Sequence, residues 1–408
     1  MKKIITMVGT SIFDNYKEKN NDNKNFSNNV EYLKDKGASE YDKNKEMIEA
    51  IIKDLKDWIK KEKDKENISA EIKSLVKLKK ELNDDNDDLD IYLLYSDTIL
   101  GKIAGEVVKE FIIADKEMFG NIQSNGIKCY MIKNLQVKDR KKFEEGMNNL
   151  IYKVYDLTQE DWNNVAINIT GGFKATIPYL TVLGQVNKCP IYYIFEKTDV
   201  LIKIPYIPLD IKWNVFEENE EFFVDLERKD ISELPNNLTF RNDIESLIEK
   251  ADNLLCINSL GITLWEKYKE RFELFYISIK VKDYIDGTKD KKQIIDSSFL
   301  ELKRRLKENP QDPDLDHKLE EVNLQGFKCF KHKEKKLQVR ILYKTEERKT
   351  RYGSKELDIF IEDIEIGSGV HNANNEYVKQ FKKILSEISD LDKYKCYRIE
   401  KAQLNKNL

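Results

Sequence analysis

Two stretches of the sequence bring together residues that could bind or cleave phosphate groups. In the first, the strand-like run 165–169 leads into Thr170, Gly171, Gly172 and Lys174. Adjacent glycines allow backbone N–H groups to approach a ligand closely, and the start of a following helix favours anions. The hydroxyl group of Thr170 and the cation of Lys174 would add to a phosphate site. The plain alternative is a strand–helix connection whose glycines serve packing alone.

The second stretch is a basic segment, Lys328–Arg351, with ten Lys or Arg residues against three Glu residues. Alternation along a strand places Lys331 and Lys333 on one face. If 334–337 forms a hairpin loop, Lys331 lies opposite Arg340 on the next strand. Like charges directly opposite destabilise a sheet by some tenths of a kcal/mol, which a bound polyanion would relieve. The plain alternative is a solvated basic face on an edge hairpin.

The elements that would position the first stretch form a parallel α/β sheet over residues 1–209. Strands alternating with helical patterns favour a Rossmann-like fold of this kind. Strands are predicted at 3–8, 91–95, 127–132, 165–170 and 190–195, with 200–207 pairing back as a hairpin, and helices at 47–63 and 99–112; residues 17–46, rich in Asn, Lys and Asp, are expected to form a solvated loop. Neither a GxGxxG nor a GxxxxGK[ST] motif is present, so neither a dinucleotide fingerprint nor a P-loop is supported.

Small polar residues follow three of the predicted strands. In an open parallel sheet the carboxyl ends of the strands meet at one crevice, which is the expected ligand site. The residues predicted to line it are Gly9, Thr10, Ser11, Ser96, Asp97, Asn168, Thr170, Gly171, Gly172 and Lys174.

The remaining chain is expected to form two further parts. Residues 210–285 carry mixed helical periodicity and are predicted to form a helical connector, for which a small winged-helix element is one candidate. Residues 286–408 are predicted to form a small α+β domain. Its expected elements are a helix at 297–307, strands at 326–333, 337–343 and 357–366, and a helix at 375–388.

Composition limits the classes of protein to consider. The chain has 408 residues, a formal charge of -4 and 35% charged residues, so any contact with nucleic acid must come from a local patch. Five cysteines are far apart without a CxxC pair, which favours reduced thiols in a cytoplasm over disulfides or a zinc site. The apolar run at 4–8 is too short for a signal peptide, and nothing approaches the ~18 apolar residues of a membrane span. We therefore expect a cytoplasmic location, no membrane partner and no metal.

With these residues in view, 1–209 resembles a CARF domain, the Rossmann-like sensor of type III CRISPR systems. The resemblance rests on the strand that leads into Gly9-Thr10-Ser11 and on the run Asn168–Lys174. It implies a homodimer whose two-fold crevice binds a cyclic oligoadenylate, with cyclic tetra-adenylate the expected ring, and with backbone amides and Lys174 facing the phosphates. Some CARF domains slowly cleave their own ligand, and here Thr10, Ser11 and Lys174 would be the residues involved.

Residues 297–388 resemble a RelE-type toxin, a ribosome-dependent mRNA endonuclease. That family carries two lysines one residue apart, an arginine seven residues after the second, and a tyrosine just before its final helix. The matching positions are Lys331, Lys333, Arg340 and Tyr377. Six residues before the tyrosine, where the family usually has an arginine, this chain has His371.

The chemistry follows from the residue types. Metal-free RNA cleavage needs a base for the 2′-hydroxyl group, a cation beside the pentavalent phosphate and an acid for the 5′-oxygen. Lys331 or Lys333, crowded by other cations, is suited to be the base. Arg340 would clamp the phosphate, His371 would serve as the acid, and Tyr377 would stack on or orient a base.

Other readings of the C-terminal part are weaker. A HEPN ribonuclease needs an arginine four to six residues before a histidine, which His317, His332 and His371 all lack. A PD-(D/E)xK nuclease needs a lysine that does not follow the acidic residues at 358–365. The alternative that stays open is a ligand-gated regulator that binds nucleic acid without cutting it. The main prediction is a homodimeric CRISPR effector in which a cyclic oligoadenylate activates a metal-independent mRNA endoribonuclease on ribosomes.

Overall fold

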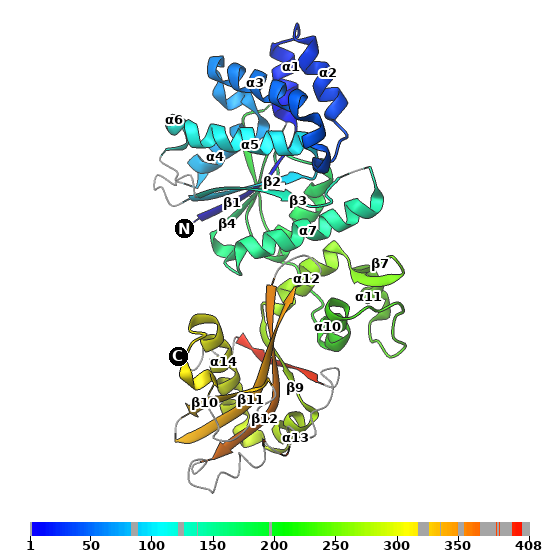
Figure 1. Ribbon diagram of the computed structural model, residues 1–408, viewed down its shortest axis with the longest axis vertical. Helices are drawn as coiled ribbons and strands as arrows, with labels where there is room; N and C mark the ends of the chain where they lie inside the picture. The colour runs from blue at the N-terminus through cyan, green and yellow to red at the C-terminus, as the bar shows by residue number, and fades with distance from the viewer. Residues whose placement is uncertain are drawn as a thin grey trace. The chain divides into compact units, whose positions relative to one another are not determined.

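The computed structural model divides the chain into two units, each with its own sheet (Figure 1). It describes residues 2–82, 89–120, 126–136, 138–195, 198–316, 326–334, 336–349, 355–367, 381, 383 and 394–401. The N-terminal unit comprises Met1–Val215 and Asp230–Lys267, and the C-terminal unit comprises Phe216–Lys229 and Tyr268–Leu408.

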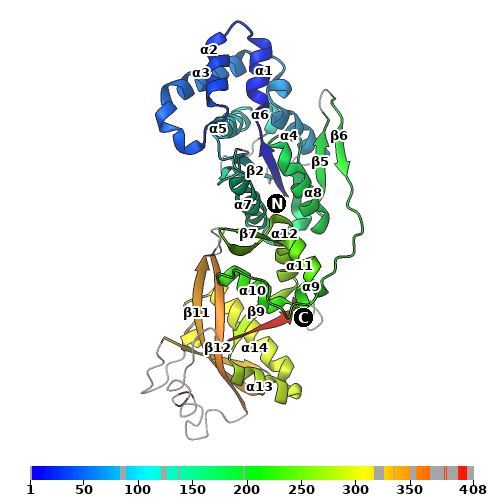
Figure 2. The same cartoon turned by 90° about the vertical axis from the view of Figure 1, so that its right-hand side faces the viewer.

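The sheet of the N-terminal unit has the strand order β3-β2-β1-β4-β5-β6. Its strands are β1 (Lys2–Val8), β2 (Leu89–Ser96), β3 (Ile127–Ile132), β4 (Val165–Asn168), β5 (Ile191–Ile194) and β6 (Leu201–Ile204). The first five run parallel, and β6 returns antiparallel to β5 as an edge hairpin (Figure 2). The predicted parallel α/β sheet is therefore confirmed, and its order is compatible with a Rossmann-like fold.

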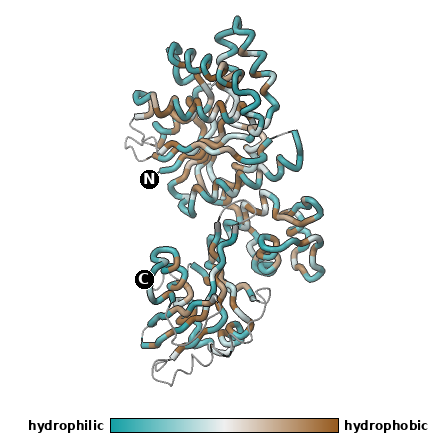
Figure 3. The backbone as a smooth tube through the Cα atoms, in the orientation of Figure 1, coloured by the Kyte–Doolittle hydropathy of each residue, from teal (hydrophilic) through white to brown (hydrophobic). Residues whose placement is uncertain are grey.

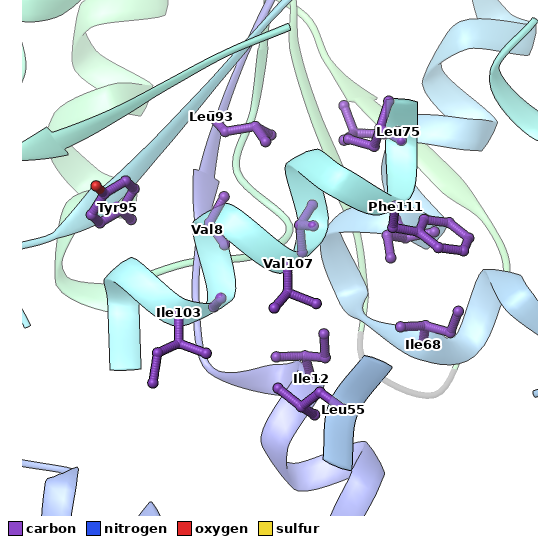
Figure 4. Packing of buried hydrophobic residues seen from close by; sticks show 14 of the residues in the cluster. Val8, Ile12, Leu55, Ile68, Leu75, Leu93, Tyr95, Ile103, Val107 and Phe111 are labelled. Carbon is purple, nitrogen blue, oxygen red and sulfur yellow. The ribbon is translucent and has the colours of Figure 1, made fainter. Parts of the chain in front are cut away.

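Helices cover both faces of this sheet, with α5 on one side and α7 on the other (Figure 1). The helices of the unit up to the edge hairpin are α1 (Ser11–Lys19), α2 (Lys24–Leu33), α3 (Lys45–Lys61), α4 (Ala70–Glu81), α5 (Ile99–Ala114), α6 (Lys116–Phe119), α7 (Arg140–Thr158) and α8 (Ile177–Val186). Hydrophobic residues concentrate in the strands between these helices, as the colouring of the backbone shows (Figure 3). Ile103 and Val107 of α5 pack in the core near Ile12 and Leu55 (Figure 4).

The expected solvated loop at 17–46 is wrong, because most of it is helical. Helix α2 buries Phe26, Val30 and Leu33, whose spacing makes one apolar stripe in a polar sequence. The side chain of Asn23 caps the helix by accepting a hydrogen bond from the Phe26 N–H group at 3.0 Å. Three apolar residues and one cap were enough to outweigh the polar composition.

The C-terminal unit contains a five-stranded sheet with the order β10-β11-β12-β9-β13. Its strands are β9 (Phe272–Ile277), β10 (Lys328–Glu334), β11 (Leu337–Lys349), β12 (Lys355–Gly367) and β13 (Lys395–Glu400), and its helices include α13 (Ile279–Gly287) and α14 (Lys292–Glu308). The helix and the three strands predicted between 297 and 366 are confirmed; the helix and the last two strands are longer than expected, and β10 begins two residues later than predicted. The helix predicted at 375–388 lies outside the described residues.

The helical connector predicted at 210–285 is wrong for two segments. Residues 272–277 form β9, which pairs parallel with β12 and antiparallel with β13 near the centre of the sheet. A short apolar run of this kind fits a buried strand as well as a helix, and its aromatic residues favour the strand. Residues 248–257 form a hairpin, β7 (Ile248–Ala251) and β8 (Leu254–Ile257), which lies in the chain between α11 (Arg241–Leu247) and α12 (Ser259–Lys269).

Ion pairs explain why part of the expected connector belongs to the C-terminal unit. Helix α10 (Glu220–Arg228) carries Glu227, which pairs with Lys269 at 2.9 Å. Arg348 of β11 pairs with Asp358 of β12 at 3.0 Å and lies 3.9 Å from Glu227. Buried charges stay in place only with such partners, so these pairs hold α10 against the sheet.

The position of β9 leads to a stability prediction. Phe275 is fully buried, so Phe275→Ala should lower the free energy of unfolding of the C-terminal unit by about 3–5 kcal/mol. Leu357→Ala, at a position that is 39% exposed, is the control and should cost far less. All four tryptophans lie in the N-terminal unit. Circular dichroism should therefore show early unfolding while tryptophan fluorescence does not; an unchanged circular dichroism transition would contradict an interior position of β9 in the sheet.

Candidate functional site

The candidate ligand site lies where the strand order of the N-terminal sheet reverses. Strand β1 lies between β2 and β4, and Thr6 of β1 is paired with Asn168 of β4. The turns that follow these two strands, beginning at Gly9 and Ile169, therefore leave the sheet side by side at its carboxyl edge. In open α/β sheets this point of reversal is where ligands bind.

The two turns touch so closely that glycine is required in both. A Cβ atom on Gly9 would lie 2.8 Å from the Gly172 nitrogen. A Cβ atom on Gly172 would lie 2.2 Å from the Met7 Cβ atom, and the φ angle of Gly172 is +90°, which L side chains rarely adopt. The sequence reading gave Gly171 and Gly172 to the approach of a ligand; the contacts of Gly9 and Gly172 are those of the plain alternative, in which glycines serve packing.

Asn168 is buried behind the turn rather than exposed in the crevice. Its Nδ2 group donates to Thr6 Oγ1 at 3.0 Å and to Ser74 Oγ at 2.8 Å. Its Oδ1 atom accepts from the Thr170 N–H group at 3.2 Å. Both amide donors are therefore used inside the protein, and Asn168 fixes the shape of the turn.

Sequence reasoning missed Glu71, a buried carboxylate at the same place. Glu71 is in the first turn of α4 and is 1% exposed. Its Oε1 atom accepts from the Gly9 N–H group at 2.8 Å, and its Oε2 atom accepts from the Ser11 hydroxyl group at 2.9 Å. Ser11 Oγ also accepts from the Ala70 N–H group at 3.1 Å. One feature of the sequence could have indicated its burial: Glu71 directly precedes Ile72, which belongs to the apolar stripe of a helix.

Residues after β2 hold neighbouring loops. Ser96 Oγ and Thr98 Oγ1 lie 2.9 Å apart, and Thr98 caps α5 by accepting from the Gly101 N–H group at 3.0 Å. Asp97 accepts from the Asn134 N–H group at 3.0 Å, which ties the turn after β3 to the crevice edge. Ser96 and Asp97 thus support the edge and are half-buried.

The candidate ligand contacts at this edge are the side chains of Thr10 and Lys174 and several backbone N–H groups. Thr10 and Lys174 are exposed, while Thr170 Oγ1 accepts from the Ile194 N–H group at 2.9 Å. Within the described part of the chain, nothing accepts a hydrogen bond from the N–H groups of Thr10, Gly171 or Gly172. Backbone donors next to a cation suit a phosphate group.

Helix α4 also carries a cation to the edge hairpin. Lys73 lies 2.5 Å from Asp199, which follows β5. Its hydrogen bond holds the pKa of the Asp199 carboxyl below its ordinary value. Glu71, Lys73 and Ser74 therefore tie one helix turn to the β1 turn, to the hairpin and to Asn168 respectively.

The predicted register of the C-terminal basic segment is confirmed. Lys331 of β10 is paired with Arg340 of β11, so Lys331, Lys333 and Arg340 share one sheet face, here called the basic face. On its other side Arg340 is paired with Glu365 of β12. This acidic neighbour offsets the like-charge contact without any polyanion, which the sequence reasoning did not anticipate.

The three residues of the basic face differ in exposure. Lys333 is exposed, Lys331 is half-buried, and Arg340 is fully buried. The Arg340 Nη1 group donates to the Val339 carbonyl oxygen at 3.1 Å. A phosphate could therefore reach Lys333 directly but Arg340 only after a rearrangement. His371 and Tyr377 lie outside the described residues.

Thiols and metals add no further site in the described ranges. All five cysteines are free, as expected, and burial raises the pKa of Cys129, Cys189 and Cys329 to about 12. Such thiols are poor nucleophiles. Among the described residues no three His, Cys, Asp or Glu side chains are grouped to hold a metal ion. The same part of the chain contains no helix with the length and apolar character that a membrane crossing requires.

One comparison with known families bears on function. Residues 66–207 match the family described as CRISPR-associated protein (Cas_APE2256). The matched segment contains Glu71, the turn after β4 and the edge hairpin. It supports a CRISPR-associated protein with a role in CRISPR defence.

The close approach of Gly9 and Gly172 predicts how much stability a side chain at Gly172 would remove. Gly172→Ala should lower the free energy of unfolding of the N-terminal unit by at least about 2 kcal/mol, because it adds both backbone strain and a steric overlap. Gly37→Ala, in the same unit, is the matched control, because a Cβ atom there would come no closer than 3.6 Å to its neighbours. Denaturant unfolding followed by tryptophan fluorescence measures the cost. Equal stability of Gly172→Ala and the wild type would show that the turns are not in contact.

Proposed function

We propose that the protein is a cyclic-oligoadenylate-activated, ribosome-dependent mRNA endoribonuclease of type III CRISPR defence, which acts as a homodimer and shuts down translation. The observation that carries the proposal is the pair of glycine turns at the point of strand reversal, one of which lies in the segment that matches a CRISPR-associated family. The resemblance of the two halves of the chain to CARF and RelE-type proteins supplies the ligand and the reaction.

The proposed ligand fits the chemistry of the crevice. Phosphates of a cyclic oligoadenylate would accept hydrogen bonds from the N–H groups of Thr10, Gly171 and Gly172, with Lys174 as the cation. A ring with two-fold symmetry suits a two-fold interface between identical subunits, and cyclic tetra-adenylate has that symmetry. Slow cleavage of the bound ring would involve the exposed Thr10 and Lys174, whereas the Ser11 hydroxyl group is already bonded to Glu71.

The proposed reaction is an internal transfer at phosphorus. Lys331 or Lys333 takes the proton of the 2′-hydroxyl group, and the 2′-oxygen attacks the neighbouring phosphorus. The bond to the 5′-oxygen breaks, and His371 gives that oxygen a proton. The products are a 2′,3′-cyclic phosphate and a free 5′-hydroxyl group. Arg340 stabilises the pentavalent phosphate, Tyr377 orients a base, and no step needs a metal.

The burial of Arg340 fits an enzyme that is inactive until its ligand binds. RNA cannot contact a guanidinium group with no exposed surface, so activation must uncover it. The same burial favours the second candidate function, a ligand-gated regulator that binds nucleic acid through Lys331 and Lys333 without cutting it.

Ligand binding tests the sensor half. Isothermal titration should show one cyclic tetra-adenylate bound per two chains, and Lys174→Ala should weaken binding by about tenfold, the loss of one charge-assisted contact. Lys188→Ala, a lysine at an exposed position after α8, should bind like the wild type. A stoichiometry of one ring per chain would contradict the two-fold site.

Two lysines of β10 test the nuclease half. With activator and ribosomes, Lys333→Ala should lower the rate of mRNA cleavage by about 10²–10⁴-fold, the usual worth of a general base. Lys328→Ala removes an exposed lysine from the opposite face of the same strand and should keep the wild-type rate. RNA binding without any cleavage in the wild type, weakened in Lys333→Ala but not in Lys328→Ala, would favour the regulator.

A further inference from the structure

The crevice contains a negative charge where the proposed ligand would bring another. Glu71 is almost fully buried, and within the described ranges no lysine or arginine forms an ion pair with it. Among the residues that the structure describes, only the Gly9 N–H group and the Ser11 hydroxyl group bind its carboxylate. A buried carboxylate held by two uncharged donors is costly in free energy, so it is poised to leave when a better anion is available.

The two donors that hold Glu71 flank Thr10 in the chain, so a phosphate at the Thr10 N–H group could also take them from the carboxylate. A phosphate and a carboxylate both bind N–H and O–H groups through negatively charged oxygens. The carboxylate also lies against Gly171, because a Cβ atom there would be 2.2 Å from Glu71 Oε1. The Glu71 carboxylate is therefore in contact with both glycine turns, at Gly9 and at Gly171.

We propose that Glu71 is an internal competitor of the ligand phosphate, which binds by displacing this carboxylate from the Gly9 turn. That the ligand carries phosphate groups rests on the proposed function. The contacts of Glu71 do not depend on it. Displacement would free the first turn of α4, which also carries Lys73 and Ser74. Binding would thereby loosen the links of α4 to Asp199 and Asn168. Glu71 lowers the affinity of the site for the ligand, because its carboxylate competes with the phosphate for the same donors.

The test compares Glu71→Gln with the wild type. Glutamine keeps the size of the side chain and an oxygen that can accept from Gly9, but it removes the negative charge. Glu81→Gln removes an exposed charge from the last turn of the same helix and is the control. Affinities are measured by isothermal titration for two probes, cyclic tetra-adenylate and inorganic tripolyphosphate.

Glu71→Gln should bind at least one probe about tenfold more tightly, which is about 1.4 kcal/mol, while Glu81→Gln should bind like the wild type. A tighter affinity for tripolyphosphate alone would support the role of Glu71 and remove the cyclic oligoadenylate from the proposed function. Equal or weaker binding of both probes would overturn the inference, since a residue that merely holds the turn in shape would lose affinity on replacement. Failure of both proteins to bind either probe would overturn it as well.

Hydrogen exchange on the wild-type protein tests the same point if Glu71→Gln does not fold. On addition of the probe that binds, amides at 70–74 should exchange faster while those at 169–173 exchange more slowly. Slower exchange in both segments would mean that α4 tightens on binding, and would overturn displacement of Glu71.

Discussion

The contact between the backbones of Gly9 and Gly172 is the constraint on which the N-terminal unit depends. Because neither position tolerates a side chain, the turns after β1 and β4 meet directly and their N–H groups lie at one edge of the sheet. Asn168 supports this contact from within the sheet, and Glu71 supports it from α4. A site made of backbone atoms is rigid, and it selects for charge and shape rather than for one side-chain partner.

The C-terminal unit depends on register in a similar way. Pairing of Lys331 with Arg340 gathers cations on one face of the sheet, and pairing of Arg340 with Glu365 balances them. In the N-terminal unit the Glu71 carboxylate likewise binds two donors, at Gly9 and Ser11, that flank Thr10 of the candidate anion site. Each unit therefore places a carboxylate beside its candidate phosphate-binding groups.

The sequence was most informative where a pattern was long or geometry followed from counting. Five parallel strands were predicted from short apolar runs that alternate with helical patterns, and the Lys331–Arg340 pairing followed from the length of one hairpin loop. Prediction from the sequence failed at 17–46, where polar residues surround a narrow apolar stripe. It also failed at β9, whose six residues fit either a helix or a strand. Glu71 and Glu365 could not be found because their partners are distant in sequence, and only the fold brings them together.

The most direct test of the account is to measure ligand occupancy and cleavage of ribosome-bound mRNA on the same preparation across a titration with cyclic tetra-adenylate. If the ligand activates the nuclease, cleavage should be near zero without it and should rise in proportion to occupancy, so that the two curves coincide. Cleavage that is independent of the ligand, or full occupancy without cleavage, would contradict the claim that one chain joins a sensor to the enzyme it controls.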